Sequence, residues 1–117
     1  MEPREIAEIA ASAAADKQAS DIVIIDISNL MIVTDFFVVC SGQSNRQVQT
    51  IAESIQDKLS ELKVRKVGFE GDRENTWILL DYGSVVVHIF TQEQRDYYNL
   101  ERLWADAPHK RWEEAGS

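Results

Sequence analysis

The sequence predicts a single α/β domain, of the α+β kind, in which helices flank a mixed five-stranded sheet. The chain has 117 residues, of which 44% are hydrophobic, and a chain of this length builds one core. Two stretches carry apolar residues at helical spacing, whereas several shorter apolar runs suit strands. No repeat, low-complexity tract or Pro/Gly-rich linker divides the chain. The expected order of elements is α-β-β-α-β-β-β-α.

The first three elements follow from apolar spacing. Residues 3–18 have a helical pattern, and Pro3 suits the first turn of a helix. "DIVIIDI" at 21–27 holds consecutive apolar residues in a run too short for a helix, which is typical of a strand buried on both faces. "FFVVC" at 36–40 predicts a second strand of this kind.

The second helix is predicted to begin after Ser44 and to end near Leu62. Ser44 and Gln47 form the capping-box pattern S-x-x-Q, which satisfies backbone donors at a helix N-terminus. The apolar residues that follow recur at spacings of three, four and seven, as on one face of a helix: Val48, Ile51, Ala52, Ile55, Leu59 and Leu62.

Three further strands and a last helical segment complete the domain. A strand near 66–70 precedes the polar loop "GDRENT", and strands at 76–81 and 85–90 are joined tightly through Tyr82 and Gly83. Thr91 and Gln94 repeat the capping-box pattern and start the final segment. We therefore expect a domain over residues 1–108 and a flexible C-terminal tail over residues 109–117.

The net charge of −8 restricts the possible partners. Because the chain has no surplus of Lys and Arg to neutralise phosphates, direct specific binding to RNA or DNA is not expected. Acidity favours solubility and encounter with a basic protein. Cys40 is the only cysteine, no apolar run is long enough to cross a bilayer, and the N-terminus resembles neither a secretory signal nor a transit peptide. We expect a cytoplasmic protein.

The strongest enzymatic interpretation begins at "VVCSGQSNRQ", where a strand, a Ser-Gly turn and a helix N-terminus together could hold a phosphate. A nucleotide-binding enzyme of the nucleotidyltransferase-like fold would need two carboxylates alternating on a neighbouring strand to hold magnesium. The nearby candidates, Glu70, Asp72 and Glu74, fall in a turn sequence. This enzyme remains the alternative interpretation.

Other catalytic groups are sparse. His88 and His109 lack carboxylates or cysteines at ligand spacing, so neither a metal nor a cofactor is indicated. His88 shares a strand face with Val86 and Phe90 and is interpreted as a packed or surface-strand histidine. Cys40 is interpreted as a small buried apolar residue.

The strand at 76–81 places Trp77, Leu79 and Asp81 on one face. One sheet face has to cover the long helix, and the other can be covered only in part, by helix 3–18 and the C-terminal segment. Trp77 and Leu79 therefore lie either beneath a helix or open to a partner. Aromatic side chains beside Arg are the composition of an interface hot spot.

The last segment offers a second aromatic group. A stripe at i, i+3 and i+7, formed by Tyr97, Leu100 and Trp104, docks either on the core of the domain itself or on a partner. The intervening side chains then point outward: Tyr98, Asn99, Glu101 and Arg102.

Four blocks of sequence resemble the ribosomal silencing factor (Iojap-like) family in order and spacing. They are "DIVIIDIS", "TDFFVVCSGQSNRQVQTIAE", "WILLDYGSVVVHIF" and "YNLERLWADAP", and the likeness covers about residues 5 to 108. Phe36 stands where the family usually has Tyr, and Thr34 where Ala is common.

The resemblance implies a translation repressor that is not an enzyme. It implies a fold related to nucleotidyltransferases but without their catalytic residues, and a partner, large-subunit ribosomal protein fourteen, on the large ribosomal subunit. Binding there would sterically block association with the small subunit. The resemblance also implies a possible homodimer.

Seven residues are predicted to bind the partner. We expect Trp77 and Leu79 to be apolar anchors, and Asp81 and Glu101 to meet Lys or Arg of the partner. The side chains that anchor or brace the last segment are then Tyr98, Leu100 and Trp104.

Overall fold

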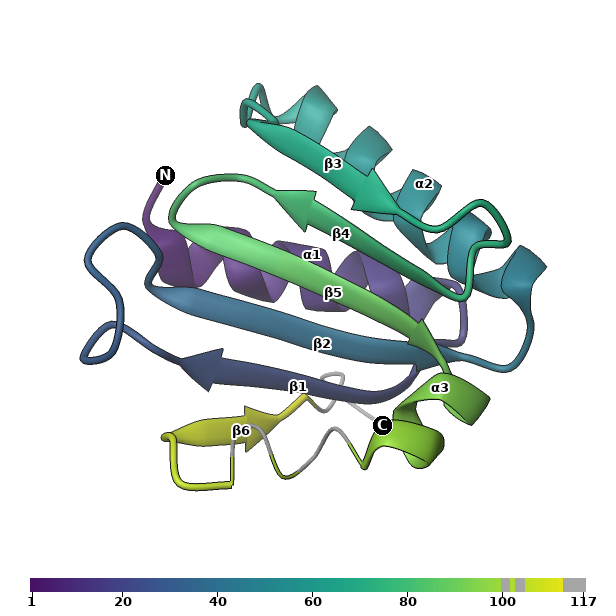
Figure 1. Cartoon of the computed structure of the whole chain (residues 1–117). Coiled ribbons are helices and arrows are strands. Elements are labelled where there is room, and N and C mark those ends of the chain that lie inside the picture. The colour runs from purple at the N-terminus through teal and green to yellow at the C-terminus, as the bar shows by residue number, and fades with distance from the viewer. Residues whose placement is uncertain (100–101, 103–104, 113–117) are drawn as a thin grey trace.

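The computed structural model of the chain describes residues 1–99, 102 and 105–112 (Figure 1). Its elements follow in the order α1 (Pro3–Asp16), β1 (Ser20–Asp26), β2 (Phe36–Gly42), α2 (Asn45–Glu61), β3 (Gly68–Gly71), β4 (Trp77–Asp81), β5 (Val85–Thr91), α3 (Gln92–Tyr98) and β6 (His109–Arg111). The predicted mixed α+β architecture and the order of the first eight elements are confirmed.

The sheet has six strands in the order β3-β4-β5-β2-β1-β6. β2 and β5 run parallel at its centre, and the other neighbours are antiparallel. The five-stranded prediction is wrong by one strand. The additional strand is β6, which is formed by residues 109–111 of the expected flexible tail. They pair with residues 23–25 of β1, which would otherwise be an edge strand with unpaired backbone groups. Residues 113–117 lie outside the described part of the chain.

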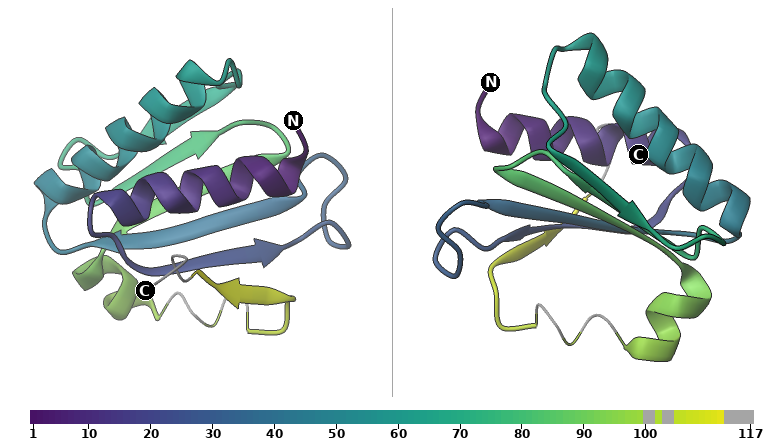
Figure 2. Two further views of the ribbon diagram at one scale, coloured as in Figure 1. Left: turned by 180° about the vertical axis from the view of Figure 1, so that it is seen from behind. Right: turned by 45° about the horizontal axis from the view of Figure 1, so that its top comes forward.

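Helices α1 and α2 lie side by side on one face of the sheet (Figure 2). The expectation that the first helix covers the other face is wrong, because α1 buries mainly small alanine side chains, which let it pack closely against both α2 and the strands. The main core fills the space between them and the strands. It contains apolar residues of α1 such as Ala7 and Ala10, and residues of α2 such as Ile51 and Ile55. No helix within the described residues is long and apolar enough to cross a membrane.

The N-terminus of α2 is closed by its own sequence. The Ser44 hydroxyl accepts a hydrogen bond from the backbone N–H of Gln47 at 3.1 Å, as the capping box predicts. The Gln47 side chain reaches back one residue further than expected, where its Oε1 accepts from the Gln43 N–H at 2.6 Å. Its Nε2 donates to the carbonyls of Lys17 and Gln18, which ties the end of α1 to the start of α2.

Helix α3 lies on the opposite side of the sheet from α1 and α2 (Figure 2). Thr91 caps it by accepting from the Gln94 N–H at 3.2 Å, as predicted. Its buried anchor is Arg95, only 1% exposed, which donates to the Asp21 carbonyl at 2.7 Å and to the Ser41 hydroxyl at 2.8 Å. Arg95 therefore fastens α3 to the ends of β1 and β2.

Candidate protein-binding face

The sheet face opposite α1 and α2 is covered over only half of its width. Over β1 and β2, four side chains form a second apolar cluster, on which Phe37, Phe90 and Ala107 pack: Val23, Ile25, Ile27 and Val39. Over β3, β4 and β5 the corresponding side chains remain at least partly exposed, except for Val86, which is buried. This difference divides the face into a closed half and an open half.

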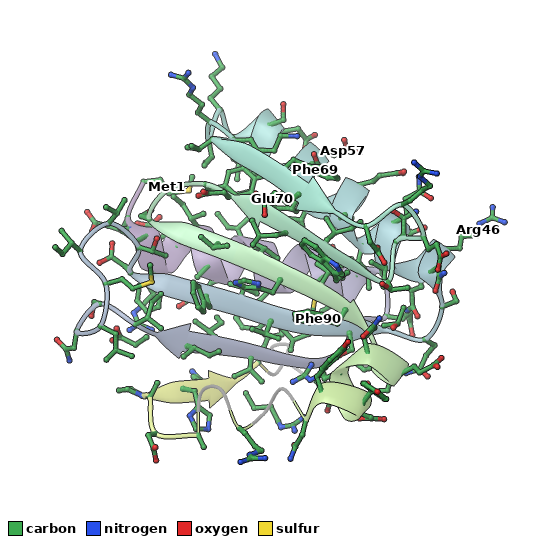
Figure 3. All side chains as sticks on the ribbon, in the orientation of Figure 1. Met1, Arg46, Asp57, Phe69, Glu70 and Phe90 are labelled. Carbon is green, nitrogen blue, oxygen red and sulfur yellow. The ribbon has the colours of Figure 1, made fainter. Side chains whose placement is uncertain are left out.

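The open half, together with Phe37 of β2 at its border with the closed half, is called the docking face below. Strand register brings its members together: Leu79 pairs with Glu70 on one side and with His88 on the other, and Trp77 pairs with Phe90. Figure 3 shows Glu70 and Phe90 on the side of the sheet turned to the viewer, away from α1 and α2. The docking face consists of Phe37, Glu70, Trp77, Leu79, Asp81, His88 and Phe90.

Trp77 and Leu79 lie on the docking face as half-buried side chains. The alternate residues of β4, Ile78 and Leu80, point into the main core, where they are buried. The predicted alternation along β4 is thus confirmed. The sequence allowed Trp77 and Leu79 to lie either beneath a helix or open to a partner. In the structure, both face away from α1 and α2.

Asp81 ends β4 on the same face. Its Oδ1 accepts a hydrogen bond from the Gly83 N–H at 2.8 Å, and Gly83 has a φ of +81°, which favours glycine. The carboxylate therefore holds the tight turn into β5 at the rim of the docking face.

His88 occupies the middle of the docking face. Its ring meets Phe37 edge-on, with centroids 4.7 Å apart, and stacks parallel to Phe90 at 6.3 Å. Its Nε2 is buried and has no hydrogen-bond partner within the described part of the chain. Burial lowers the pKa of His88 to about 4, so the ring is neutral near pH 7. A neutral imidazole keeps the face apolar.

The predicted aromatic group of the last segment is described only in part. Tyr98 is exposed at the end of α3 and meets the ring of Tyr97 edge-on, with centroids 4.8 Å apart. Tyr97 is 79% exposed, so the interpretation in which it docks on the core of the domain is wrong. Arg95 takes the buried position instead. Leu100, Glu101 and Trp104 lie outside the described residues.

Two features beside these residues are not among those expected from the sequence. One is Arg95, because a buried arginine has no signature in apolar spacing. The other is a hollow of about 420 Å³ at the end of the docking face, where Met31 and Thr34 of the β1–β2 loop approach Leu79, Asp81 and His88. The run "LMIV" at 30–33 is the signal that could have indicated it.

The turn that could have held a phosphate is filled by protein atoms. Hydrogen bonds of Ser44 and Gln47 occupy the N–H groups of Gln43 and Gln47 at the start of α2. A Cβ added to Gly42 would lie 3.1 Å from the Val48 nitrogen, so the backbone is closely packed there. The N–H groups of Gln43 and Gln47 are therefore not available to a phosphate.

Of the nearby acids, Asp72 is engaged in local structure. Asp72 accepts hydrogen bonds from the Thr76 N–H and hydroxyl and from the Trp77 N–H. Burial raises the pKa of Asp72, but these hydrogen bonds outweigh it and bring the pKa below its usual value. Among the described residues, no group of three or more His, Cys, Asp or Glu side chains is arranged to hold a metal ion.

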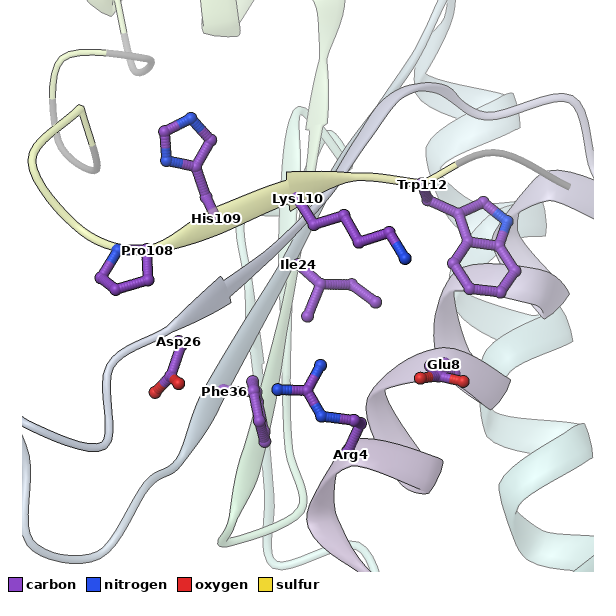
Figure 4. A pocket seen from close by; sticks show the side chains of 9 residues that line it. All are labelled: Arg4, Glu8, Ile24, Asp26, Phe36, Pro108, His109, Lys110 and Trp112. Carbon is purple, nitrogen blue, oxygen red and sulfur yellow. The ribbon is translucent and has the colours of Figure 1, made fainter.

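A separate hollow of about 250 Å³ lies between α1 and β6 (Figure 4). Arg4 and Lys110 line it together with the acids Glu8 and Asp26, and the Arg4 guanidinium lies 4.8 Å above the Phe36 ring. Because both signs of charge are present, this hollow does not select an anion.

Three comparisons relate the chain to known proteins. Residues 1–116 match the family described as "Ribosomal silencing factor during starvation". The chain is 45% identical over 108 residues to "Ribosomal silencing factor RsfS" of Bacillus subtilis (strain 168), covering 92% of each chain. It is 35% identical over 91 residues to the mouse "Mitochondrial assembly of ribosomal large subunit protein 1", covering 75% of this chain and 40% of that one. The crystal structure of protein CV0518 from Chromobacterium violaceum superimposes with a TM-score of 0.85 at 39% identity, covering 100% of this chain and 98% of that one.

Proposed function

This chain belongs to the ribosomal silencing factor family, and from that membership we propose that it represses translation by binding the large ribosomal subunit. The proposed contact on that subunit is large-subunit ribosomal protein fourteen. The bound chain occupies space that the small subunit needs, and so prevents the two subunits from joining.

The observation that carries this proposal is the docking face. It presents Trp77, Leu79 and Phe90 on strands held rigidly from behind by the main core, with Glu70 and Asp81 at its rim. Aromatic side chains within a polar rim are typical of protein interfaces. A partner that covers these side chains gains apolar burial without having to order them first.

Charge supports a basic partner. The chain carries a net charge of −8, whereas ribosomal proteins are rich in Lys and Arg because they neutralise phosphates. Opposite charges accelerate association and align the surfaces. Glu70 and Asp81 from the described rim, and Glu101 from the last segment, are the proposed partners of Lys or Arg. The proposed anchors in the last segment are Tyr98, Leu100 and Trp104.

The chain acts without catalysis in this proposal. Two observations weigh against the alternative, a nucleotide-binding enzyme: Asp72 is hydrogen-bonded to Thr76 and Trp77, and the backbone at Gly42 is closely packed. Direct sequence-specific contact with RNA has no role in it. A protein acting on ribosomes in this way would work in the cytoplasm. The homodimer implied by the family resemblance stays a prediction.

The proposal is tested by equilibrium binding, with purified large subunits and isolated ribosomal protein fourteen as ligands. We expect saturable binding to both, with the isolated protein competing against large subunits for the chain. Binding to large subunits without any competition by the isolated protein would refute the named partner. Absence of binding to either, together with heat of binding for magnesium and a nucleoside triphosphate in calorimetry, would favour the enzyme.

A further inference from the structure

The loop between β1 and β2 exposes a run of large apolar side chains. Ile32 is fully exposed at 103%, Val33 is 74% exposed, Leu30 73% and Met31 47%. Single exposed apolar residues are common, but consecutive ones indicate an interaction site. Residues 28–34 are called the apolar loop below.

The apolar loop is held at both ends. At its start, the Asp26 carboxylate accepts from the backbone N–H and the hydroxyl of Ser28, and these bonds lower the pKa of Asp26. At its end, the Thr34 hydroxyl donates to the Gly83 carbonyl at 3.0 Å.

Backbone bonds also close the loop upon itself. The N–H groups of Leu30 and Met31 donate to the Ile27 carbonyl, and the Ile27 N–H donates to the Asp35 carbonyl at 2.9 Å. A loop fixed in this way loses little conformational freedom on binding. Its exposed side chains are therefore presented in a defined arrangement.

The apolar loop is continuous with the docking face. Met31 and Thr34 line the hollow of about 420 Å³ whose other walls include Leu79, Asp81 and His88. Thr34 is also bonded to the turn that joins β4 to β5, so loop and face share one framework. A protein that covers Leu79 and Asp81 necessarily comes close to Met31.

We propose that the apolar loop is a second contact element for the same basic partner, and that it inserts Leu30 and Ile32 into an apolar recess of that protein. This inference rests on the proposed function. It extends the binding surface beyond the seven residues that the sequence indicated and adds an apolar projection at one end of the sheet.

The charge around the apolar loop argues for a basic protein as its partner, and against both an anionic membrane and a second copy of this chain. The apolar loop itself carries no Lys or Arg, and Asp26 and Asp35 stand next to its two ends. A loop that inserts into anionic lipid carries basic residues beside its apolar ones. A second copy of this chain would bring another net charge of −8 to the contact. A basic protein surface complements both the apolar tip and its acidic surroundings.

The test measures binding of full-length variants to purified large subunits. Ile32→Ser is the loop variant, Leu79→Ala the docking-face variant, and Leu62→Ser the control, since Leu62 is an exposed aliphatic residue at the end of α2, on the opposite face. We expect Ile32→Ser to weaken binding about tenfold or more, Leu79→Ala to weaken it too, and Leu62→Ser to have no effect. Thermal unfolding should be unchanged in Ile32→Ser because its side chain touches solvent only.

The outcomes separate this inference from the proposed function. Full affinity of Ile32→Ser beside weakened Leu79→Ala overturns the role of the apolar loop alone. Full affinity of both variants overturns the docking face as well. Two further measurements test the alternative partners of the apolar loop. Sedimentation equilibrium of the chain alone tests a second copy, and binding to vesicles of phosphatidylcholine and phosphatidylserine tests an anionic membrane. A dimer that Ile32→Ser dissociates, or vesicle binding that it abolishes, with affinity for large subunits unchanged, also overturns the inference.

Discussion

Replacing Trp77 with alanine should weaken binding to the large ribosomal subunit about thirtyfold or more. Trp77 lies half-buried on the docking face, and it is paired in register with Phe90 on the neighbouring strand. Truncating a central aromatic anchor typically costs at least ~2 kcal/mol of binding free energy, which corresponds to that factor. Co-sedimentation of labelled chain with purified large subunits, titrated over three decades of concentration, measures it.

The fold should survive this substitution. Trp77 faces away from the main core. The residues of β4 that fill this core are Ile78 and Leu80, and both remain in place. Leu62→Ala provides the matched control, because it removes exposed apolar surface on the far side of the molecule. If Trp77→Ala has a native circular dichroism spectrum and retains full affinity, Trp77 is not an anchor.

Acidification from pH 7 to pH 5 should destabilise the free chain by on the order of 2 kcal/mol through His88 alone. Burial lowers the pKa of His88 from 6.5 to about 4 in the folded state. Between these two values the unfolded chain binds a proton that the folded chain does not, so the free energy of unfolding falls as the pH falls. Well above pH 6.5, His88 does not change the free energy of unfolding as the pH changes. Below pH 4 the loss of stability caused by His88 is complete. Urea unfolding at a series of pH values measures it.

The variant His88→Leu isolates this effect. Its side chain suits the surroundings of Phe37 and Phe90 and removes a buried nitrogen that lacks a hydrogen-bond partner in the described part of the chain. The hydrogen-bonded carboxylates Asp26 and Asp72 have lowered pKa values, so their contribution to stability is lost mainly below pH 4. We therefore expect a flatter profile for His88→Leu between pH 7 and pH 5. Equal slopes for the two proteins would show that His88 is not responsible.

The regular elements could be predicted from the sequence because each carries a local physical signal. The apolar run at 21–27 predicted β1, and the caps at Ser44 and Thr91 located the starts of α2 and α3. Alternation along β4 assigned Trp77 and Leu79 to one face and Leu80 to the other. Such patterns depend on residues near one another in the chain, which is why single-sequence reasoning recovers them.

Features that depend on distant residues could not be predicted in this way. Strand β6 consists of the polar residues His109, Lys110 and Arg111, which have no strand pattern and pair because β1 offers a free edge. The role of Arg95 depends on Asp21 and Ser41, more than fifty residues away. Ala107, which follows α3, packs on the apolar cluster over β1 and β2, and apolar spacing within one element does not predict such a contact.

The most direct test of the central claim is a subunit-joining experiment, in which light scattering reports the association of large and small subunits as the chain is added. The account predicts that the wild-type chain reduces joining in a saturable manner, at concentrations matching its affinity for large subunits. Trp77→Ala should require correspondingly higher concentrations. Undiminished joining, with every large subunit carrying a bound chain, would contradict the claim that this protein acts by occupying the path of the small subunit.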